Sequence, residues 1–323
     1  MTDDDHQHEN DEEEYNEDED LPIAKTTLPE ILEDMEANPD NPLLLLKSID
    51  AIGNLAADST ENRLEIVQAG KNGKSALDSI LNCMALYPQD ANLQASACDA
   101  LSNLAFDVET KDVLAKEGVI NIVLDTMEKF HDDTSVLTSC LSAVGNLADK
   151  NPENQITIAQ KGGIDATMKA MKDHPTDVIL VWYGVEALAN LACDAKNQET
   201  IPACGGLDAV LEAMELHPDK PELQASACLA IRNLAFQKDN RDIIPRKGGI
   251  QAVITAMNNH VEDPDVQKDG CEALYSLTFT AANKDLIKEA GGIEAIQAAM
   301  KTHEEDENVI MAGEDAMKRF EPK

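Results

Sequence analysis

The chain has few aromatic residues, no long apolar run and no closely spaced cysteine pair. Only 3% of its 323 residues are Phe, Trp or Tyr, so any core is aliphatic. No stretch approaches the ~20 apolar residues needed to cross a bilayer. The first residues contain neither a basic nor an apolar segment, so they do not predict a signal peptide. Seven cysteines without a CxxC pair predict buried thiols in a reducing compartment, the cytoplasm and also the nucleus.

Sequence motifs of catalysis are absent as well. The chain contains no phosphate-binding loop, no GxSxG, HExxH or GxGxxG pattern and no EF-hand loop. Carboxylates are abundant, but no pair stands in an apolar setting that would tune its pKa for catalysis. We therefore expect a protein that is not an enzyme and that needs neither a cofactor nor a metal.

Positive charge is scarce, and the net charge is −36. Residues 1–20 contain 12 acidic and no basic residues, which predicts a disordered acidic tail. Residues 21–323 remain acidic, with 50 acids against 26 bases. Such a surface repels nucleic acid phosphates and anionic lipids. It either attracts basic proteins or simply maintains solubility, and we expect no nucleic acid partner and no membrane insertion.

The most informative feature present is a repeat of about 43 residues. Five histidines are each 43 residues apart, and five Asn-Leu pairs follow nearly the same period. A period of this length predicts stacked helical units. In residues 162–204, a glycine pair opens a helix that ends near His174, a longer helix follows, and a short third helix leads to the next glycine pair. The pattern predicts an all-α solenoid of about seven three-helix repeats over residues 21–323, with a longer loop near residues 70–73.

The periodic histidines do not predict a metal site. Equivalent residues of stacked helices are ~8–10 Å apart, whereas zinc requires nitrogens at ~2 Å. We expect these rings to satisfy free backbone carbonyls at helix C-termini instead.

The repeat ending Ala-x-x-Asn-Leu-Ala, found at 51–56, 100–105 and 187–192, resembles the armadillo repeat. The resemblance implies a right-handed superhelix whose groove binds extended peptides or helices of partner proteins. The segments 213–218, 224–228 and 231–234 look more specifically like the armadillo-repeat-containing protein six group and related protist repeat proteins.

On each long helix, the asparagine and the residues four and eight positions before it share one face, which we expect to line the concave side. The resemblance implies that the asparagine amides bind the backbone of a partner; the alternative is that they bond a neighbouring helix and fix the register. Acidic residues stand four positions before several asparagines, and Trp182 lies on the same face. Trp182 is either an interface hot spot or packs against the next repeat. The predicted groove consists of Asn54, Asp99, Asn103, Asn146, Trp182, Glu186, Asn190, Asn233 and Glu272.

The function expected from these features is a scaffold or adaptor that binds a basic, extended or helical segment of a partner protein in its groove. Two alternatives stay open. One is a regulatory exchange factor or chaperone-like binder of a globular client. The other is an atypical nuclear transport adaptor, which is less favoured because the groove lacks a tryptophan ladder.

Overall fold

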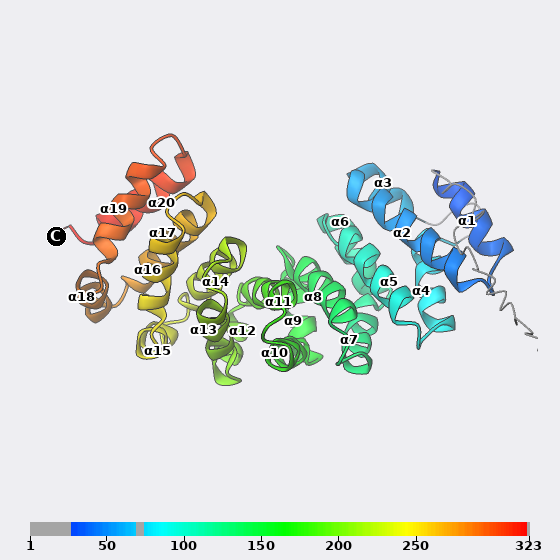
Figure 1. The fold of residues 1–323 in the computed structure, drawn as a ribbon, viewed down its shortest axis with the longest axis horizontal. Helices are drawn as coiled ribbons and strands as arrows, with labels where there is room; N and C mark the ends of the chain where they lie inside the picture. The colour runs from blue at the N-terminus through cyan, green and yellow to red at the C-terminus, as the bar shows by residue number, and fades with distance from the viewer. Residues whose placement is uncertain (1–26, 69–73, 322–323) are drawn as a thin grey trace, which may run out of the picture.

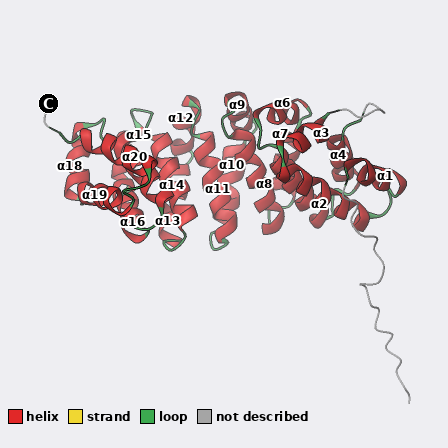
Figure 2. Ribbon diagram, turned by 90° about the horizontal axis from the view of Figure 1, so that it is seen from above, coloured by secondary structure: helices red, strands yellow, loops and turns green. Residues whose placement is uncertain are grey.

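The computed structural model describes residues 27–68 and 74–321, which contain twenty α-helices and no strand. The expected tail at 1–20 and the expected longer loop at 70–73 lie outside these residues. The helices form an arc whose two ends rise above its middle (Figure 1). Seen from above, they stack side by side along one axis (Figure 2). The predicted all-α armadillo-type solenoid is confirmed.

Three helices recur in six of the seven repeats, and the first repeat has two helices, α1 and α2, within the described residues. The long third helices are α2 (Pro42–Asp58), α5 (Ala91–Leu104), α8 (Thr134–Ala148), α11 (Val178–Leu191), α14 (Pro221–Leu234), α17 (Pro264–Leu277) and α20 (Glu307–Lys318). The second helices are α1 (Leu28–Ala37), α4 (Ala76–Leu86), α7 (Val119–Lys129), α10 (Gly163–Asp173), α13 (Gly206–Leu216), α16 (Gly249–Asn259) and α19 (Gly292–Thr302). The short first helices are α3 (Thr60–Val67), α6 (Val108–Lys116), α9 (Pro152–Gln160), α12 (Ala195–Ala203), α15 (Asn240–Arg246) and α18 (Ala281–Glu289). Seven long helices confirm the predicted number of repeats.

Local sequence signals set the helix ends. The N-cap carboxylates of Asp90, Asp133 and Asp177 each accept a backbone N–H from the first turn of a third helix. At the corner before α10, Gly162 has φ 85°, a conformation that costs a side chain free energy. A Cβ on the following Gly163 would collide with Ile158. The first glycine therefore provides the turn and the second the close packing.

The third helices pack against one another in chain order and form the inner layer of the stack. Their apolar stripes are buried: Leu188 is 1% exposed and Leu191 is fully buried. A single core of aliphatic residues runs through the described repeats. It places the asparagine-bearing face of each third helix beside the same face of the next.

Polar side chains also join the repeats. The amide of Asn197 on α12 donates to Leu191 O at the end of α11, the third helix of the preceding repeat, and to Gln155 O on α9, the first helix of that repeat, at 3.0 and 3.1 Å. Asn240 and Asn283 make the equivalent pairs of bonds. Each asparagine thus satisfies a helix-end carbonyl and ties two repeats together.

Four of the periodic histidines link repeats in a similar way. Nε2 of His174, His217, His260 and His303 lies 2.8–2.9 Å from a backbone oxygen in the turn of the preceding repeat. The expected satisfaction of free carbonyls is therefore seen, and the carbonyl belongs to the neighbouring repeat.

Candidate functional site

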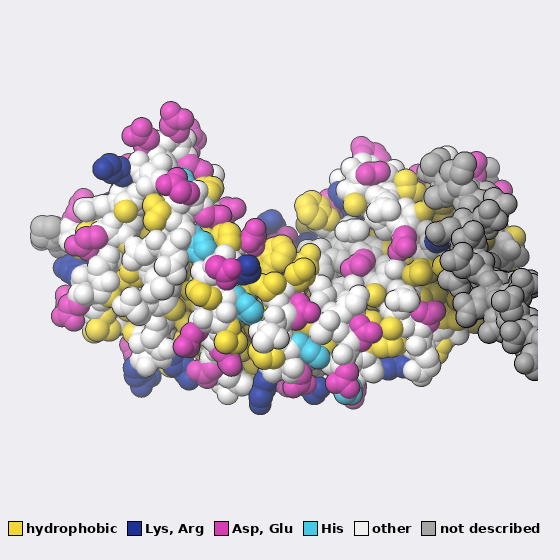
Figure 3. Space-filling view, viewed as in Figure 1, with side chains coloured by type: hydrophobic (Ala, Val, Ile, Leu, Met, Phe, Trp, Pro, Cys, Tyr) yellow, Lys and Arg dark blue, Asp and Glu magenta, His cyan; other side chains and the backbone are white. Residues whose placement is uncertain are grey.

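The hollow side of the arc is formed by third helices, with α8, α11 and α14 at its middle and α17 and α20 facing it from the C-terminal arm (Figure 1). The space-filling view shows this hollow, with apolar side chains at its floor over α8 and α11 and acidic side chains along its walls (Figure 3). The predicted groove residues all lie on third helices, from α2 to α17. We call this face the inner groove.

The asparagines of the groove form a regular ladder. Nδ2 of Asn103, Asn146, Asn190 and Asn233 donates to the backbone oxygen of Gly53, Ser102, Gly145 and Ala189, at 2.9–3.2 Å. Each acceptor is the residue immediately before the asparagine position of the preceding repeat. The donor half of the amide therefore fixes the register between repeats, which was one of the two roles considered.

The acceptor half of these amides is not used in the same way. No hydrogen bond reaches the Oδ1 atoms of Asn103, Asn146 and Asn190 from the part of the chain that the structure describes, and these side chains are half-buried. Asn54, the first of the series, is exposed. An amide held by its N–H group presents a fixed carbonyl acceptor. Binding of a partner's backbone by these oxygens stays a prediction.

Carboxylates in the N-terminal part of the groove have no cationic partner. Asp50, Asp99 and Glu186 form no ion pair with any residue in 27–68 or 74–321. Burial, together with the charge of Asp149, raises the pKa of Glu186. Desolvation also raises the pKa of Asp99; a hydrogen bond with Ser139 opposes this shift and nearby Asp50 adds to it. Cations brought by a ligand would relieve this unfavourable concentration of negative charge.

In the C-terminal part, the chain supplies its own cations. Glu272 lies 3.1 Å from Arg232 of the preceding repeat, and the side chains are 29% and 33% exposed. Asp269 on the same helix lies 3.4 Å from Lys268. The predicted groove residue Glu272 is therefore placed on the groove but is already neutralised.

Trp182 shows one of its two predicted roles, packing against the next repeat, and its role as an interface hot spot stays a prediction. Its ring stacks on Tyr183 at 4.8 Å, and Nε1 donates to Ser226 Oγ on the next third helix at 3.2 Å. The side chain nevertheless remains partly exposed. It packs against the neighbouring repeat and leaves part of the ring at the surface.

Three exposed phenylalanines were missed by the sequence reading. Phe106, Phe236 and Phe279 are 69%, 57% and 49% exposed, three residues after the asparagine position. Arginine guanidinium carbons lie 4.3–5.9 Å from their ring centroids, supplied by Arg63, Arg232, Arg241 and Arg319. The signal for them was the repeated Asn-Leu-Ala-Phe at 103–106 and 233–236, in which each phenylalanine directly follows the C-cap of its third helix.

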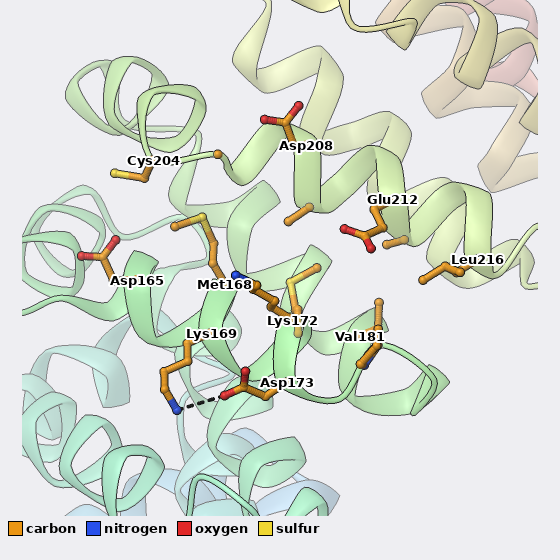
Figure 4. Close-up of a pocket in the computed structure, with 15 residues that line it drawn as sticks. Asp165, Met168, Lys169, Lys172, Asp173, Val181, Cys204, Asp208, Glu212 and Leu216 are labelled. Atoms are coloured by element: carbon orange, nitrogen blue, oxygen red, sulfur yellow. Dashed lines mark ion pairs between the residues drawn. The ribbon is translucent and has the colours of Figure 1, made fainter.

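A cavity of about 550 Å³ lies between the second helices α10 and α13 and contains none of the predicted groove residues. Figure 4 shows its lining, including the ion pair of Lys169 and Asp173, whose atoms are 3.0 Å apart. Val181 on its wall occupies the position that is Gln224 in the next repeat, where the amide donates to Met214 O and His217 O. An apolar side chain replaces a helix-capping amide at this cavity.

No group of three or more metal-ligating side chains suited to an ion occurs in residues 27–68 and 74–321. Every helix within those ranges is too short or too polar to cross a bilayer.

Comparison with known proteins agrees with this geometry. A model of the family described as the GAC ARM domain matches residues 44–281. No protein of curated function matches the chain. An engineered protein of solved structure is 21% identical with a TM-score of 0.73, over 90% of this chain and 67% of that one. A designed armadillo repeat protein in complex with the peptide (KR)4 is 18% identical with a TM-score of 0.65, over 77% and 99% of the two chains. A structure of computationally designed armadillo repeat proteins for modular peptide recognition is 19% identical with a TM-score of 0.64, over 77% of this chain and 99% of that one.

Proposed function

The chain belongs to the GAC ARM domain family, whose fold here is an armadillo-repeat solenoid, and from this premise we propose that it is a scaffold that binds a basic, extended segment of a partner protein in its inner groove. The single observation that carries the proposal is the row of asparagine carbonyl oxygens beside carboxylates that have no cationic partner within residues 27–68 and 74–321. Asn103 and Asn190 supply oxygens, and Asp99 and Glu186 supply charge.

The spacing of the groove suits an extended partner. Adjacent third helices lie ~8–10 Å apart, and an extended chain advances ~3.3 Å per residue. Successive asparagines of the groove therefore lie opposite every third residue of an extended partner. Acceptors at this interval can bind partner backbone N–H groups whatever the side chains are. Selectivity for Lys and Arg then comes from the carboxylates. Each exposed ion pair contributes only ~0–1 kcal/mol to the free energy of binding. Several repeats must therefore act together.

The test uses the full chain and a fluorescein-labelled (KR)4 peptide, followed by fluorescence polarisation. The double variant Asp99→Lys, Glu186→Lys should weaken binding at least ~10-fold, because two attractive contacts become repulsive. The matched control is Asp125→Lys, Glu212→Lys, which makes the same change in net charge at exposed positions of α7 and α13. Circular dichroism monitors folding. If both double variants bind like the parent chain, the groove proposal is wrong.

Three finer assignments belong to the same proposal. We assign residues 21–323 to one solenoid domain and residues 1–20 to a separate acidic segment. We place the protein in the cytoplasm, and also the nucleus, in keeping with seven cysteines that are all free thiols. The segments at 213–218 and 224–234 support a relation to the armadillo-repeat-containing protein six group.

A further inference from the structure

A small cavity opens in the inner groove beside Ser276 of α17, which stands where five other third helices carry the ladder asparagine. It has a volume of about 180 Å³ and lies among α14, α17 and α20. Its lining comprises Arg232, Phe236, Glu272, Tyr275, Ser276, Met311, Ala312 and Asp315. We call it the Ser276 pocket.

The replacement of asparagine by the shorter Ser276 adds space to this cavity. In the earlier repeats the asparagine reaches the backbone oxygen of the preceding third helix; the oxygen in that position here belongs to Arg232. Ser276 is too short to follow this pattern, and its hydroxyl makes no hydrogen bond with any residue that the structure describes. Two missing side-chain atoms thus leave space in an otherwise regular ladder.

Four of the eight residues that line the Ser276 pocket are apolar or aromatic, and its charged residues are paired within the chain. Phe236 and Met311 are 57% and 60% exposed, and Tyr275 packs edge-to-face on Phe279 at 5.3 Å. Arg232 is paired with Glu272, and Asp315 lies 2.9 Å from Lys318. A cationic side chain would therefore compete with cations already present, whereas an apolar one would only displace water.

We infer that the Ser276 pocket receives one apolar side chain, of the size of Phe, Leu or Met, from the same partner segment whose basic residues lie along Asp99 and Glu186. The inference rests on the proposed function. A dry cavity of ~150 Å³ holds a benzene ring, so 180 Å³ suits a single such side chain. Met311 gives the rim an adaptable side chain that can close around different apolar groups.

The repeat geometry fixes the spacing of the two features in the partner. The Ser276 pocket lies two to two-and-a-half helix spacings beyond α11, or ~16–25 Å. An extended chain covers this distance in about 5–8 residues. The partner is thus a basic stretch separated by roughly seven residues from one apolar anchor.

The experiment measures binding of the full chain to labelled peptides by fluorescence polarisation. One peptide is (KR)4 followed by six Gly/Ser residues and Phe, and its control ends in Ser. Both are also made in reverse order, because either chain direction fits the groove. Phe should tighten binding ~10-fold over Ser in one of the two orders.

Protein variants tie the gain to the pocket. Ser276→Asn introduces the residue found at this position in five other repeats, and it should make the Phe and Ser peptides bind alike. Met311→Gln on the exposed rim should reduce the preference for the Phe peptide over the Ser peptide to about threefold. This variant provides a second measurement if Ser276→Asn folds poorly. Leu286→Ala, an exposed apolar residue of α18, is the control and should keep the full gain.

The outcomes separate the two proposals. If the Ser peptide binds but Phe adds nothing in either order, the pocket inference is overturned while the proposed function stands. A gain that persists in both Ser276→Asn and Met311→Gln also overturns it, because Phe then binds elsewhere. If no peptide binds, both the groove function and the inference built on it fail.

Discussion

The two halves of the inner groove share one framework but carry different chemistry. In the N-terminal half, Asp50, Asp99 and Glu186 have no cationic partner within the described residues. In the C-terminal half, Glu272 and Asp269 are each paired with a cation of the chain, and two of the three exposed phenylalanines, Phe236 and Phe279, lie there. The first half is suited to a basic ligand and the second to an apolar one.

This difference teaches which positions of a repeat are constrained. Leucines of the core, glycines of the corner and the ladder asparagines recur because stacking requires them. The groove position four residues before the asparagine contributes little to stacking, so it can be Asp, Ser, Glu or Leu without changing the fold. A repeat protein can therefore hold its architecture constant while the ligand-facing surface changes from one repeat to the next.

The largest effect is expected where the two halves join. Leu188 on α11 is 1% exposed within the core, and Leu188→Asp would bury a charge without a partner. We expect a loss of about 3–5 kcal/mol in the free energy of unfolding. Urea unfolding followed by circular dichroism measures it, with Leu188→Met as the volume-conserving control. Equal midpoints for the two variants would show that α11 does not couple the halves.

In the C-terminal half, a buried carboxylate makes the free energy of unfolding depend on pH. Asp269 is 7% exposed, and desolvation, opposed by Lys268, raises its pKa to about 6. A carboxyl whose pKa is higher in the folded chain holds its proton more tightly when folded. It therefore lowers stability as pH rises from about 4, its unfolded pKa, and the loss is complete above pH 6.

Asp269→Asn should accordingly raise the free energy of unfolding by roughly 1–2 kcal/mol at pH 7.5 and leave it nearly unchanged at pH 3.5. Thermal unfolding at the two pH values measures the difference. Ser226→Asn, at the equivalent position of the preceding repeat, is the control without a titrating group. A gain of equal size at both pH values would rule out the pKa of Asp269 as its cause.

A matched pair of substitutions compares the two halves directly. Glu186→Gln removes a carboxylate without a cation, and Glu272→Gln removes one that already pairs with Arg232. We expect (KR)4 to bind about fivefold more weakly to the first variant and less than twofold more weakly to the second. Fluorescence polarisation at low and high salt measures both, and salt should narrow the difference. Equal losses would mean that the halves do not differ in their affinity for basic residues.

Most of the framework was predictable from the sequence because its signals are local. The helix pattern, the glycine corner and the long helices appear in the structure where the sequence placed them. The ladder asparagines lie on the long helices, as the sequence predicted. Their Nδ2 atoms donate to backbone oxygens of the preceding repeat. Leu188 and Leu191, on the apolar stripe of a long helix, are buried in the stack.

The chemistry of the groove was less predictable because it depends on contacts between repeats. Arg232 and Glu272 are 40 residues apart, and only the stacking distance reveals that one neutralises the other. The Ser276 pocket likewise arises from the gap that a short side chain leaves against two other helices. Periodicity identifies which residues share a face. Which of them form ion pairs, and where a pocket remains, depends on the distances between side chains of neighbouring helices.

The smallest effect is expected from converting the C-terminal half toward the N-terminal type. Arg232→Gln releases Glu272 from its ion pair and should make (KR)4 bind about two- to threefold more tightly, because one exposed carboxylate contact becomes available. Arg246→Gln on α15 makes the same change in net charge away from the groove and should have less effect. If both variants gain equally, long-range charge explains the binding. If Arg232→Gln weakens binding, the arginine on Phe236, 5.9 Å from its ring centroid, is itself part of the peptide site.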